Sequence, residues 1–238
     1  MDDDSYIFLD TMHNYLADFN ASEPYYIGAS NRFKGCGIKS YSESPRFAHG
    51  SAIVLSHVAL KRLQPHIDKC IVDYQECFAG DVRTALCLRD AGINLTRAEG
   101  RGFWKFAPNH EFTWPKDPCS KPIVFHHLLS EQIQRLYTLE RHPRNPHIGV
   151  TTSEIYHAFY TPKHKFDNIA RRGEKPLAVH ENATETACLD ACVLDTECVV
   201  WTMEAGKCEL FDQVFEGKPV DGAVSEVLPD RYICHVGI

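Results

Sequence analysis

Several features are missing from this sequence of 238 residues, and each absence argues against a class of protein. There is no basic excess, because 25 lysines and arginines stand against 32 aspartates and glutamates, for a net charge of −7. A nucleic acid would meet no positive field, which argues against nucleic-acid binding as the main task. No apolar run approaches the ~20 residues of a membrane span, no signal peptide precedes the acidic start, and no paired CxxC zinc pattern occurs.

Cysteine, in contrast, is abundant, with ten residues. That number is high for a reduced cytosolic enzyme of this size and indicates an oxidising compartment. Three N-x-S/T sequons agree with a secretory route, at Asn20, Asn94 and Asn182. Because a luminal protein needs a targeting segment and none is visible here, we expect this chain to be a fragment of a longer protein.

Apolar patterns alternate between strands and helices through residues 1–141. Short apolar runs predict strands over Tyr6–Leu9 and in the segments PYYIGAS, SAIVL, INLT and KPIVF. Helices are expected after most of them, the first with Met12, Tyr15, Leu16 and Phe19 on one face. We expect Ser56, Asp81 and Ser130 as helix N-caps and Gly92 as a helix end. Strands that alternate with helices favour an α/β layer architecture.

The rest of the chain has a different character. Residues 142–181 are rich in proline and basic residues and lack a sustained apolar period, which predicts a linker. Residues 182–238 are compact and cysteine-rich, which predicts a small second domain. The expected organisation is therefore a main domain over residues 1–141, a linker and an appended module.

The acidic start, Asp2, Asp3 and Asp4, has two interpretations. Carboxylates at the end of a strand can hold a hard divalent cation in the crevice where α/β sheets bind ligands. Such an ion would stabilise the charge that develops on a diphosphate leaving group. Alternatively, the three residues are a solvated acidic end of the chain.

Four blocks resemble, in their order, the fringe and core-1 β1,3-galactosyltransferase group of glycosyltransferase family 31, its fungal members in particular: DDDSYIFLD, FAHGSAIVLSHVALKRL, GDVRTALCLRDAGI and PIVFHHL. The resemblance covers roughly residues 2–139. It implies a GT-A (Rossmann-like) fold, a UDP-sugar donor, manganese and inversion at the anomeric carbon. In that family a nucleotide-binding half precedes the acidic block, so we expect this half and a type II membrane anchor upstream of Met1.

The resemblance also implies a metal site. Asp4 matches the last aspartate of the DxD motif and is the expected metal ligand. His126 matches the histidine that completes the metal shell, with His127 as the alternative. Asp2 and Asp3 would contact metal-bound water or the nucleotide. Without that context, a histidine at a strand end is more often an ordinary core or surface side chain.

Further roles carry over by position. Asp81 matches the second carboxylate of an acidic pair and is the expected catalytic base, while the first acid of the pair is Gly80 here. Gly50 and Ser51 lie in a block that is glycine-rich in the family, and they would contact the donor sugar. Trp104 is a candidate platform for a sugar ring, although a partly buried core tryptophan is at least as common.

The C-terminal module resembles a PAN/apple module in the segment ACLDACVLDTECVVWTMEAGKCELF. This resemblance implies the disulfides Cys188–Cys208 and Cys192–Cys198, which would pin a helix to a sheet in a module too small to rely on its core. In the main domain we expect Cys70–Cys87 to close the loop that carries Asp81. Modules of this class bind proteins or glycans, so a purely stabilising role is the alternative.

The leading hypothesis is a metal-dependent inverting glycosyltransferase of the secretory lumen, in the Golgi. It would move a hexose or N-acetylhexosamine from a UDP-sugar to a glycan or glycoprotein acceptor in a β1,3 linkage. The main alternative is an inactive transferase remnant whose PAN-like module binds carbohydrate or protein. A metal-dependent phosphoesterase is a third option, since acidic clusters and histidines suit that chemistry too.

Overall fold

The computed structural model describes residues 3–37, 46–49, 52–98, 102–108, 113–141, 149–160 and 164–235. Three residues of the expected donor site, Asp2, Gly50 and Ser51, lie outside these ranges. The chain forms two compact units. The first comprises Met1–Ala107 and Pro122–Gln134, and the second comprises Pro108–Lys121 and Arg135–Ile238.

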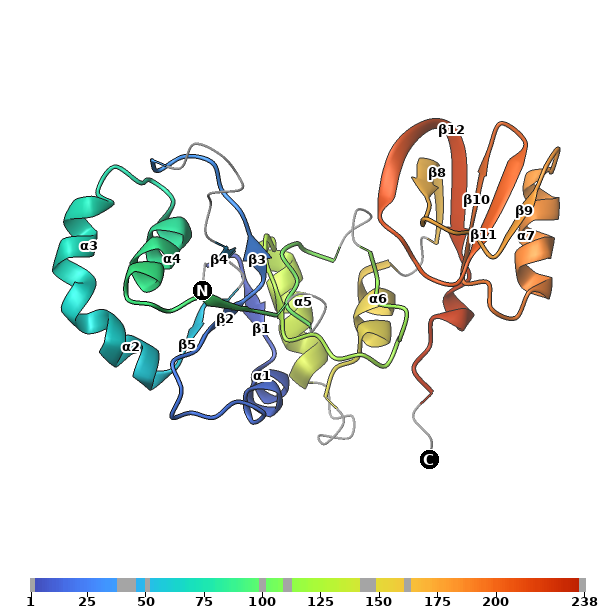
Figure 1. The fold of residues 1–238 in the computed structure, drawn as a ribbon. Helices are drawn as coiled ribbons and strands as arrows, with labels where there is room; N and C mark the ends of the chain where they lie inside the picture. Colours follow the sequence, from blue (N-terminus) through green and yellow to red (C-terminus); the bar gives the residue numbers. More distant parts are fainter. Residues whose placement is uncertain are drawn as a thin grey trace. The chain divides into compact units, whose positions relative to one another are not determined.

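The first unit alternates short strands with helices (Figure 1). Its strands are β1 (Tyr6–Ile7), β2 (Tyr26–Gly28), β3 (Ser30–Asn31), β4 (Phe47–Ala48), β5 (Val54–Leu55), β6 (Leu95–Arg97) and β7 (Val124–Phe125). Its helices are α1 (Leu9–Leu16), α2 (His57–Leu63), η1 (Gln64–His66), α3 (Ile67–Asp73) and α4 (Gly80–Asp90). Helix α5 (Ser130–Arg141) begins in this unit.

Strand β2 organises the core of the first unit. It pairs in parallel with β6 and antiparallel with β5. Side chains alternate across a strand, so Tyr26 joins the apolar cluster with residues of α2 and α4, while Ile27 joins the cluster with Met12 of α1. Apolar layers on both faces of β2 confirm the mixed α/β architecture that the alternating pattern predicts.

The helix ends show where local sequence signals succeed and fail. Ser56 is the N-cap of α2, since its Oγ accepts a hydrogen bond from the Ala59 N–H at 3.1 Å. Gly92, with φ of +74°, follows α4 as expected. The prediction of Asp81 as an N-cap is wrong, because Ala79 holds that position and makes no side-chain cap. Asp81 lies in the first turn instead, and its Oδ1 accepts from the Val82 N–H at 2.8 Å.

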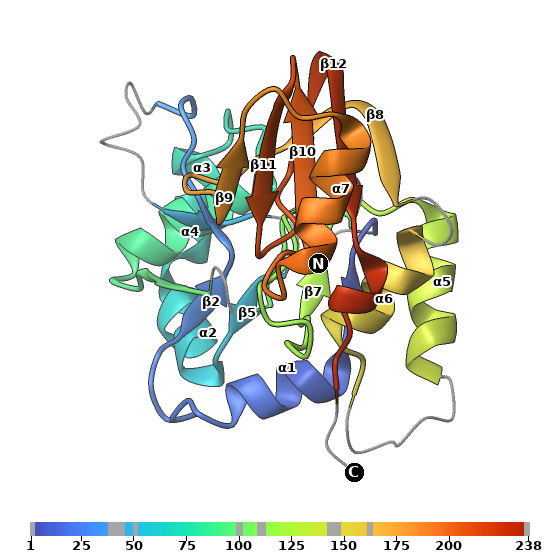
Figure 2. The same cartoon turned by 90° about the vertical axis from the view of Figure 1, so that its right-hand side faces the viewer.

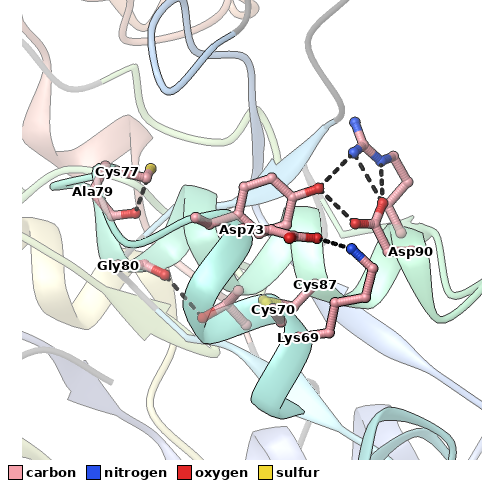
Figure 3. The surroundings of a disulfide bond; sticks show 11 residues. Lys69, Cys70, Asp73, Cys77, Ala79, Gly80, Cys87 and Asp90 are labelled. Carbon is pink, nitrogen blue, oxygen red and sulfur yellow. Dashed lines mark hydrogen bonds and ion pairs between the residues drawn. A yellow bond between two sulfur atoms is a disulfide. The ribbon is translucent and has the colours of Figure 1, made fainter. Parts of the chain in front are cut away.

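Two disulfides hold the connection from α3 to α4, which leads directly to Asp81. Figure 3 shows Cys70 of α3 next to Cys87 of α4, and this pair confirms the predicted disulfide. Cys77, in the connection itself, is joined to Cys36. The Tyr74 hydroxyl adds a hydrogen bond of 2.5 Å to Asp90 Oδ2. The start of α4 is therefore covalently anchored on both sides of the turn that precedes it.

The second unit contains the sheet β8 (Lys165–Arg171), β12 (Gly217–Val227), β10 (Val200–Glu204), β11 (Lys207–Phe211) and β9 (Ala178–His180), in that spatial order. It also holds α6 (Thr152–Tyr160), α7 (Glu185–Leu194) and η2 (Pro229–Arg231). Helix α7 lies against one face of this sheet (Figures 1 and 2). The disulfides Cys188–Cys208 and Cys192–Cys198 are confirmed, and they surround the fully buried Trp201.

The segment 142–181 differs from the predicted linker. It contains α6, and its strands β8 and β9 form both edges of the five-stranded sheet. Arg171 shows why composition misled the prediction: it is only 1% exposed, donates to the Phe215 carbonyl at 2.6 Å and stacks over Phe166 at 4.7 Å. A basic residue therefore belongs to the core of this unit.

The second unit also includes a segment, residues 108–121, that was expected to be part of the main domain. Trp114 is fully buried, its backbone N–H donates to the Val214 carbonyl at 2.8 Å, and its ring packs against Tyr156 and Tyr232. A disulfide joins Cys119 to Cys234. The expected boundary at residue 141 is thus replaced by one in which residues 108–121 belong with the C-terminal part.

All ten cysteines are paired, in five disulfides. The sequon residues Asn20, Asn94 and Asn182 are all exposed. Both observations fit a protein of the secretory lumen or the extracellular space. Within the described ranges, no helix has the length and apolar character needed to cross a bilayer.

Gly28 provides a test of how tightly the first unit is packed. A Cβ at this position would lie 2.4 Å from the Ala48 Cβ and 2.7 Å from the Ala52 carbonyl oxygen. We therefore expect Gly28→Ala to lower the free energy of unfolding by about 1–3 kcal/mol, because β2 must move away from β4. Urea unfolding measures this loss. Gly80→Ala is the control, since a Cβ there meets nothing within 4 Å, and an equal loss in this control would contradict the packing argument.

Candidate functional site

The pairing of β1 with β7 brings the acidic block to the FHH segment. The two strands run antiparallel, with Tyr6 opposite Phe125 and Ile7 opposite Val124. Beyond the strands, the Leu128 N–H donates to the Asp4 carbonyl at 2.9 Å. The residues just before β1 therefore lie beside the residues just after β7, although more than 100 positions separate them in the sequence.

The Asp4 carboxylate faces two imidazoles. Its Oδ1 lies 3.1 Å from His126 Nε2, and its Oδ2 lies 3.4 Å from His127 Nδ1. The His126 side chain is nearly inaccessible, whereas the Asp4 side chain is 38% exposed. The structure thus brings together the two residues expected to bind metal, Asp4 and His126, at the boundary between core and solvent. It also shows that His127, the alternative, takes part in the same cluster.

The position of the His127 ring results from an unusual backbone conformation. Its φ is +57°, in the left-handed region that non-glycine residues adopt at a cost of about 1–2 kcal/mol. This turn folds the ring back onto its neighbour, so that the His126 and His127 rings stack with centroids 3.9 Å apart. The backbone turn is what lets two consecutive residues point to one place.

His49 adds a third imidazole, which was not among the residues expected at this site. Its ring centroid lies 5.3 Å from that of His126 and 5.8 Å from that of His127. One nitrogen from each of the three rings lies within 4.8 Å of the others. The backbone holds His49 in place at the end of β4, where its N–H donates to the Ala29 carbonyl at 2.8 Å. A histidine at the first position of a block that is glycine-rich in the family was the signal that could have found it.

The electrostatic surroundings keep His49 suitable as a ligand. Burial lowers the pKa of His49, and the neighbouring His126 lowers this pKa further, while the charge of Asp81 opposes the shift. Neutral imidazole, the form with a free electron pair, is therefore favoured near neutral pH.

The contacts of Asp4 have the spacing of ligands around a divalent metal ion. Ligands that bind one ion at about 2.1 Å lie about 3–4 Å from each other, which matches the spacing of Asp4 from His126 and His127. Asp4 Oδ1 is buried and approaches His126 Nε2 closely, yet no partner in the described ranges offers it a hydrogen bond of ordinary geometry. Two ligand atoms that point at a common ion would have this relation.

Asp81 lies within electrostatic reach of this cluster. Its charge acts on His49 and also on Tyr26, whose hydroxyl accepts a hydrogen bond from the Ala48 N–H at 2.7 Å. Asp81, at the start of α4, is therefore near enough to His49 for its charge to act on this ring.

Phe106 is an exposed aromatic residue beside the cluster. Trp104 is half-buried, and its backbone N–H donates to the Val124 carbonyl at 2.9 Å. Phe106 is 60% exposed and stacks on His127, with centroids 6.1 Å apart and an interplanar angle of 27°. Of the two, Phe106 is the better candidate for contact with a sugar ring.

The comparisons with known proteins support part of this interpretation. Residues 40–142 match a family described as "Protein of unknown function, DUF604". This family is related to glycosyltransferases. The match covers less than half of the chain but includes His49, Asp81, His126 and His127. It therefore supports a glycosyltransferase-like protein at the level of this region.

Among the solved structures that match, we consider one that is similar to part of the chain. It is described as the solution structure of a PAN module from Eimeria tenella, with 27% sequence identity and a TM-score of 0.24. The similarity covers 32% of this chain and 86% of that module. A TM-score of this size does not establish a shared fold.

Tyr26 yields a pH-dependent prediction. Burial raises the pKa of its hydroxyl to about 12, against the opposing hydrogen bond from Ala48. Since the folded pKa exceeds the unfolded value of about 10, the contribution of Tyr26 is fully present below pH ~10 and is lost as pH rises toward ~12. The free energy of unfolding of Tyr26→Phe should therefore decrease by about 2–3 kcal/mol less at alkaline pH than that of the wild type. Urea unfolding between pH 8 and 11.5 measures the slope, with Tyr25→Phe as the control. An unchanged slope in Tyr26→Phe would contradict the assignment.

Proposed function

We propose that the first unit is the metal-dependent catalytic part of an inverting glycosyltransferase that transfers a hexose or N-acetylhexosamine from a UDP-sugar to a glycan or glycoprotein acceptor in a β1,3 linkage. One observation carries the proposal: Asp4 of the acidic block lies 3.1 Å from His126 of the FHH segment. The sequence resemblance assigns both residues to one metal site. The match to a glycosyltransferase-related family is consistent with this function.

Asp4 and His126 would hold the metal. When bound, a divalent ion such as Mn²⁺ supplies charge that stabilises the diphosphate as it leaves. Asp4 provides a carboxylate oxygen and His126 a ring nitrogen, and Asp3 would contact the nucleotide or metal-bound water. Because His126 is almost fully buried, its ring orientation is fixed before the donor binds.

Asp81 would act as the base. It accepts the proton of the acceptor hydroxyl while that oxygen forms a bond to the anomeric carbon, and the bond from this carbon to the UDP oxygen breaks. The configuration inverts because the acceptor enters opposite the leaving UDP. The hydrogen bond from Val82 fixes one carboxylate oxygen of Asp81, and the anchored turn before α4 limits its movement. Phe106 would stack against a sugar ring beside His127.

The compartment that fits this function is the Golgi lumen, where UDP-sugars serve as donors for secreted glycans. The five disulfides suit an oxidising lumen, and the three exposed sequons allow the protein itself to carry glycans.

A second candidate is a binding protein in which the PAN-like second unit acts and the first unit is an inactive remnant. The observation that favours it is a pocket of about 430 Å³ lined by Arg172, Glu204, Ala205, Lys207 and Glu209. Charged side chains of both signs can bind sugar hydroxyls or a charged peptide. Binding to a glycan array without affinity for UDP would favour this candidate.

The proposed metal site predicts a specific loss of nucleotide binding. Asp4→Ala or His126→Ala should weaken Mn²⁺-dependent UDP binding by at least ~10-fold, since each variant removes a metal ligand. Calorimetry in the longest form that the gene encodes measures the affinity. His13→Ala, at an exposed position on α1, is the control. UDP affinity that is unchanged in both site variants would exclude this metal site.

Asp81 can be tested separately. Asp81→Asn retains an oxygen that accepts from the Val82 N–H, so the melting temperature should change little. The amide cannot take up the acceptor's proton, so transfer should fall by about 10²–10⁴-fold. UDP binding should persist, because the base contacts the acceptor rather than the nucleotide. Transfer, melting temperature and UDP affinity are measured on the same variant, and near-normal transfer would refute the role of Asp81.

A further inference from the structure

We infer that His49 and His127 join Asp4 and His126 as ligands of one metal ion, and that this imidazole-rich set binds Zn²⁺ more tightly than Mn²⁺ and binds Mg²⁺ or Ca²⁺ poorly. The inference deepens the proposed function and rests on it for the role of the ion. Binding of the ion can nevertheless be measured without nucleotide, sugar or turnover.

Geometry supports a four-residue site. The three imidazoles each bring a nitrogen within 4.8 Å of the other two, and the carboxylate reaches two of them at 3.1 and 3.4 Å. The residues come from three segments of the chain: Asp4 lies two positions before β1, His49 directly follows β4, and His126 and His127 directly follow β7. Backbone hydrogen bonds fix two of these places, from Leu128 to Asp4 and from His49 to Ala29.

The ligand chemistry supports the choice of ion. Mg²⁺ and Ca²⁺ are hard cations that take oxygen ligands, whereas three of these four ligands are imidazole nitrogens. Imidazole suits zinc-class ions, and for a given nitrogen site Zn²⁺ binds more tightly than Mn²⁺ in the usual order of divalent metals. Three imidazoles and one carboxylate would supply four ligands to a zinc ion, and a fifth position of a five-coordinate ion would be left for a diphosphate oxygen.

The strained backbone of His127 agrees with a role for its ring. A left-handed φ costs the folded protein stability, and such conformations persist where the surrounding structure enforces them, often at ligand sites. His127→Gly therefore serves as a clean test, since glycine adopts this conformation at no steric cost while the imidazole is lost.

The experiment titrates the protein, prepared without a polyhistidine tag, with Zn²⁺, Mn²⁺ and Mg²⁺ in separate calorimetric runs. We expect one Zn²⁺ per chain, bound more tightly than Mn²⁺, with no Mg²⁺ binding at matched concentrations. His49→Ala and His127→Gly should each weaken Zn²⁺ binding by at least ~10-fold. His13→Ala should leave the affinity unchanged. Visible absorption of the Co²⁺-substituted protein reports the coordination, and its bands should change in His49→Ala.

The outcomes separate this inference from the proposed function. Wild-type Zn²⁺ affinity in a folded His49→Ala or His127→Gly variant would remove that residue from the site, and Mg²⁺ affinity equal to that of Zn²⁺ would overturn the inferred preference. If His49→Ala fails to fold, the Zn²⁺ affinity of His127→Gly decides whether imidazoles beyond His126 bind the ion. Tight Zn²⁺ binding without any UDP affinity would leave the inference standing and reject the transferase proposal.

Discussion

The antiparallel pairing of β1 with β7 is the constraint on which the candidate site depends. It consists of two strands of two residues each, yet it fixes the register between segments more than 100 positions apart. Because side chains alternate along a strand, a slip of β1 by one residue would turn its side chains to the opposite face and shift Asp4 along β7. The contact between Asp4 and His126 would then be lost. The buried side chains of Phe8, Val124 and Phe125 therefore help to set the geometry of the candidate site by specifying this register.

A second constraint comes from the packing around β2. Ala48, at the end of β4, packs closely against Gly28 of β2. The Ala48 N–H also donates a hydrogen bond to the hydroxyl of Tyr26, which is on β2 as well. His49 is the next residue. Its position thus follows from a missing side chain at Gly28 and a buried hydroxyl at Tyr26, both on β2. Core packing and site geometry are in this way properties of the same few residues.

Much of the first unit could be predicted from local sequence, because Ser56, Gly92 and the apolar face of α1 act through neighbours a few positions away. The resemblance supplied the pairing of Asp4 with His126, which no local pattern could give. His49 was missed because its partners come from other strands, and a lone histidine after a short strand carries no periodic signal. Composition did not predict β8, because the Phe215 carbonyl that accepts a hydrogen bond from the buried Arg171 is 44 positions away in the sequence.

The way in which the sequence is divided between the two units limits how gene segments that encode them can be exchanged. Residues 108–121 belong to the second unit, although residues of the first unit stand on both sides of them in the sequence. A gene segment that encoded only the cysteine-rich C-terminal part would lack Trp114, and it would leave Cys234 without its partner Cys119. The second unit is therefore encoded by two separate stretches of sequence. Insertion or deletion of one continuous gene segment could not add or remove it without also affecting residues of the first unit.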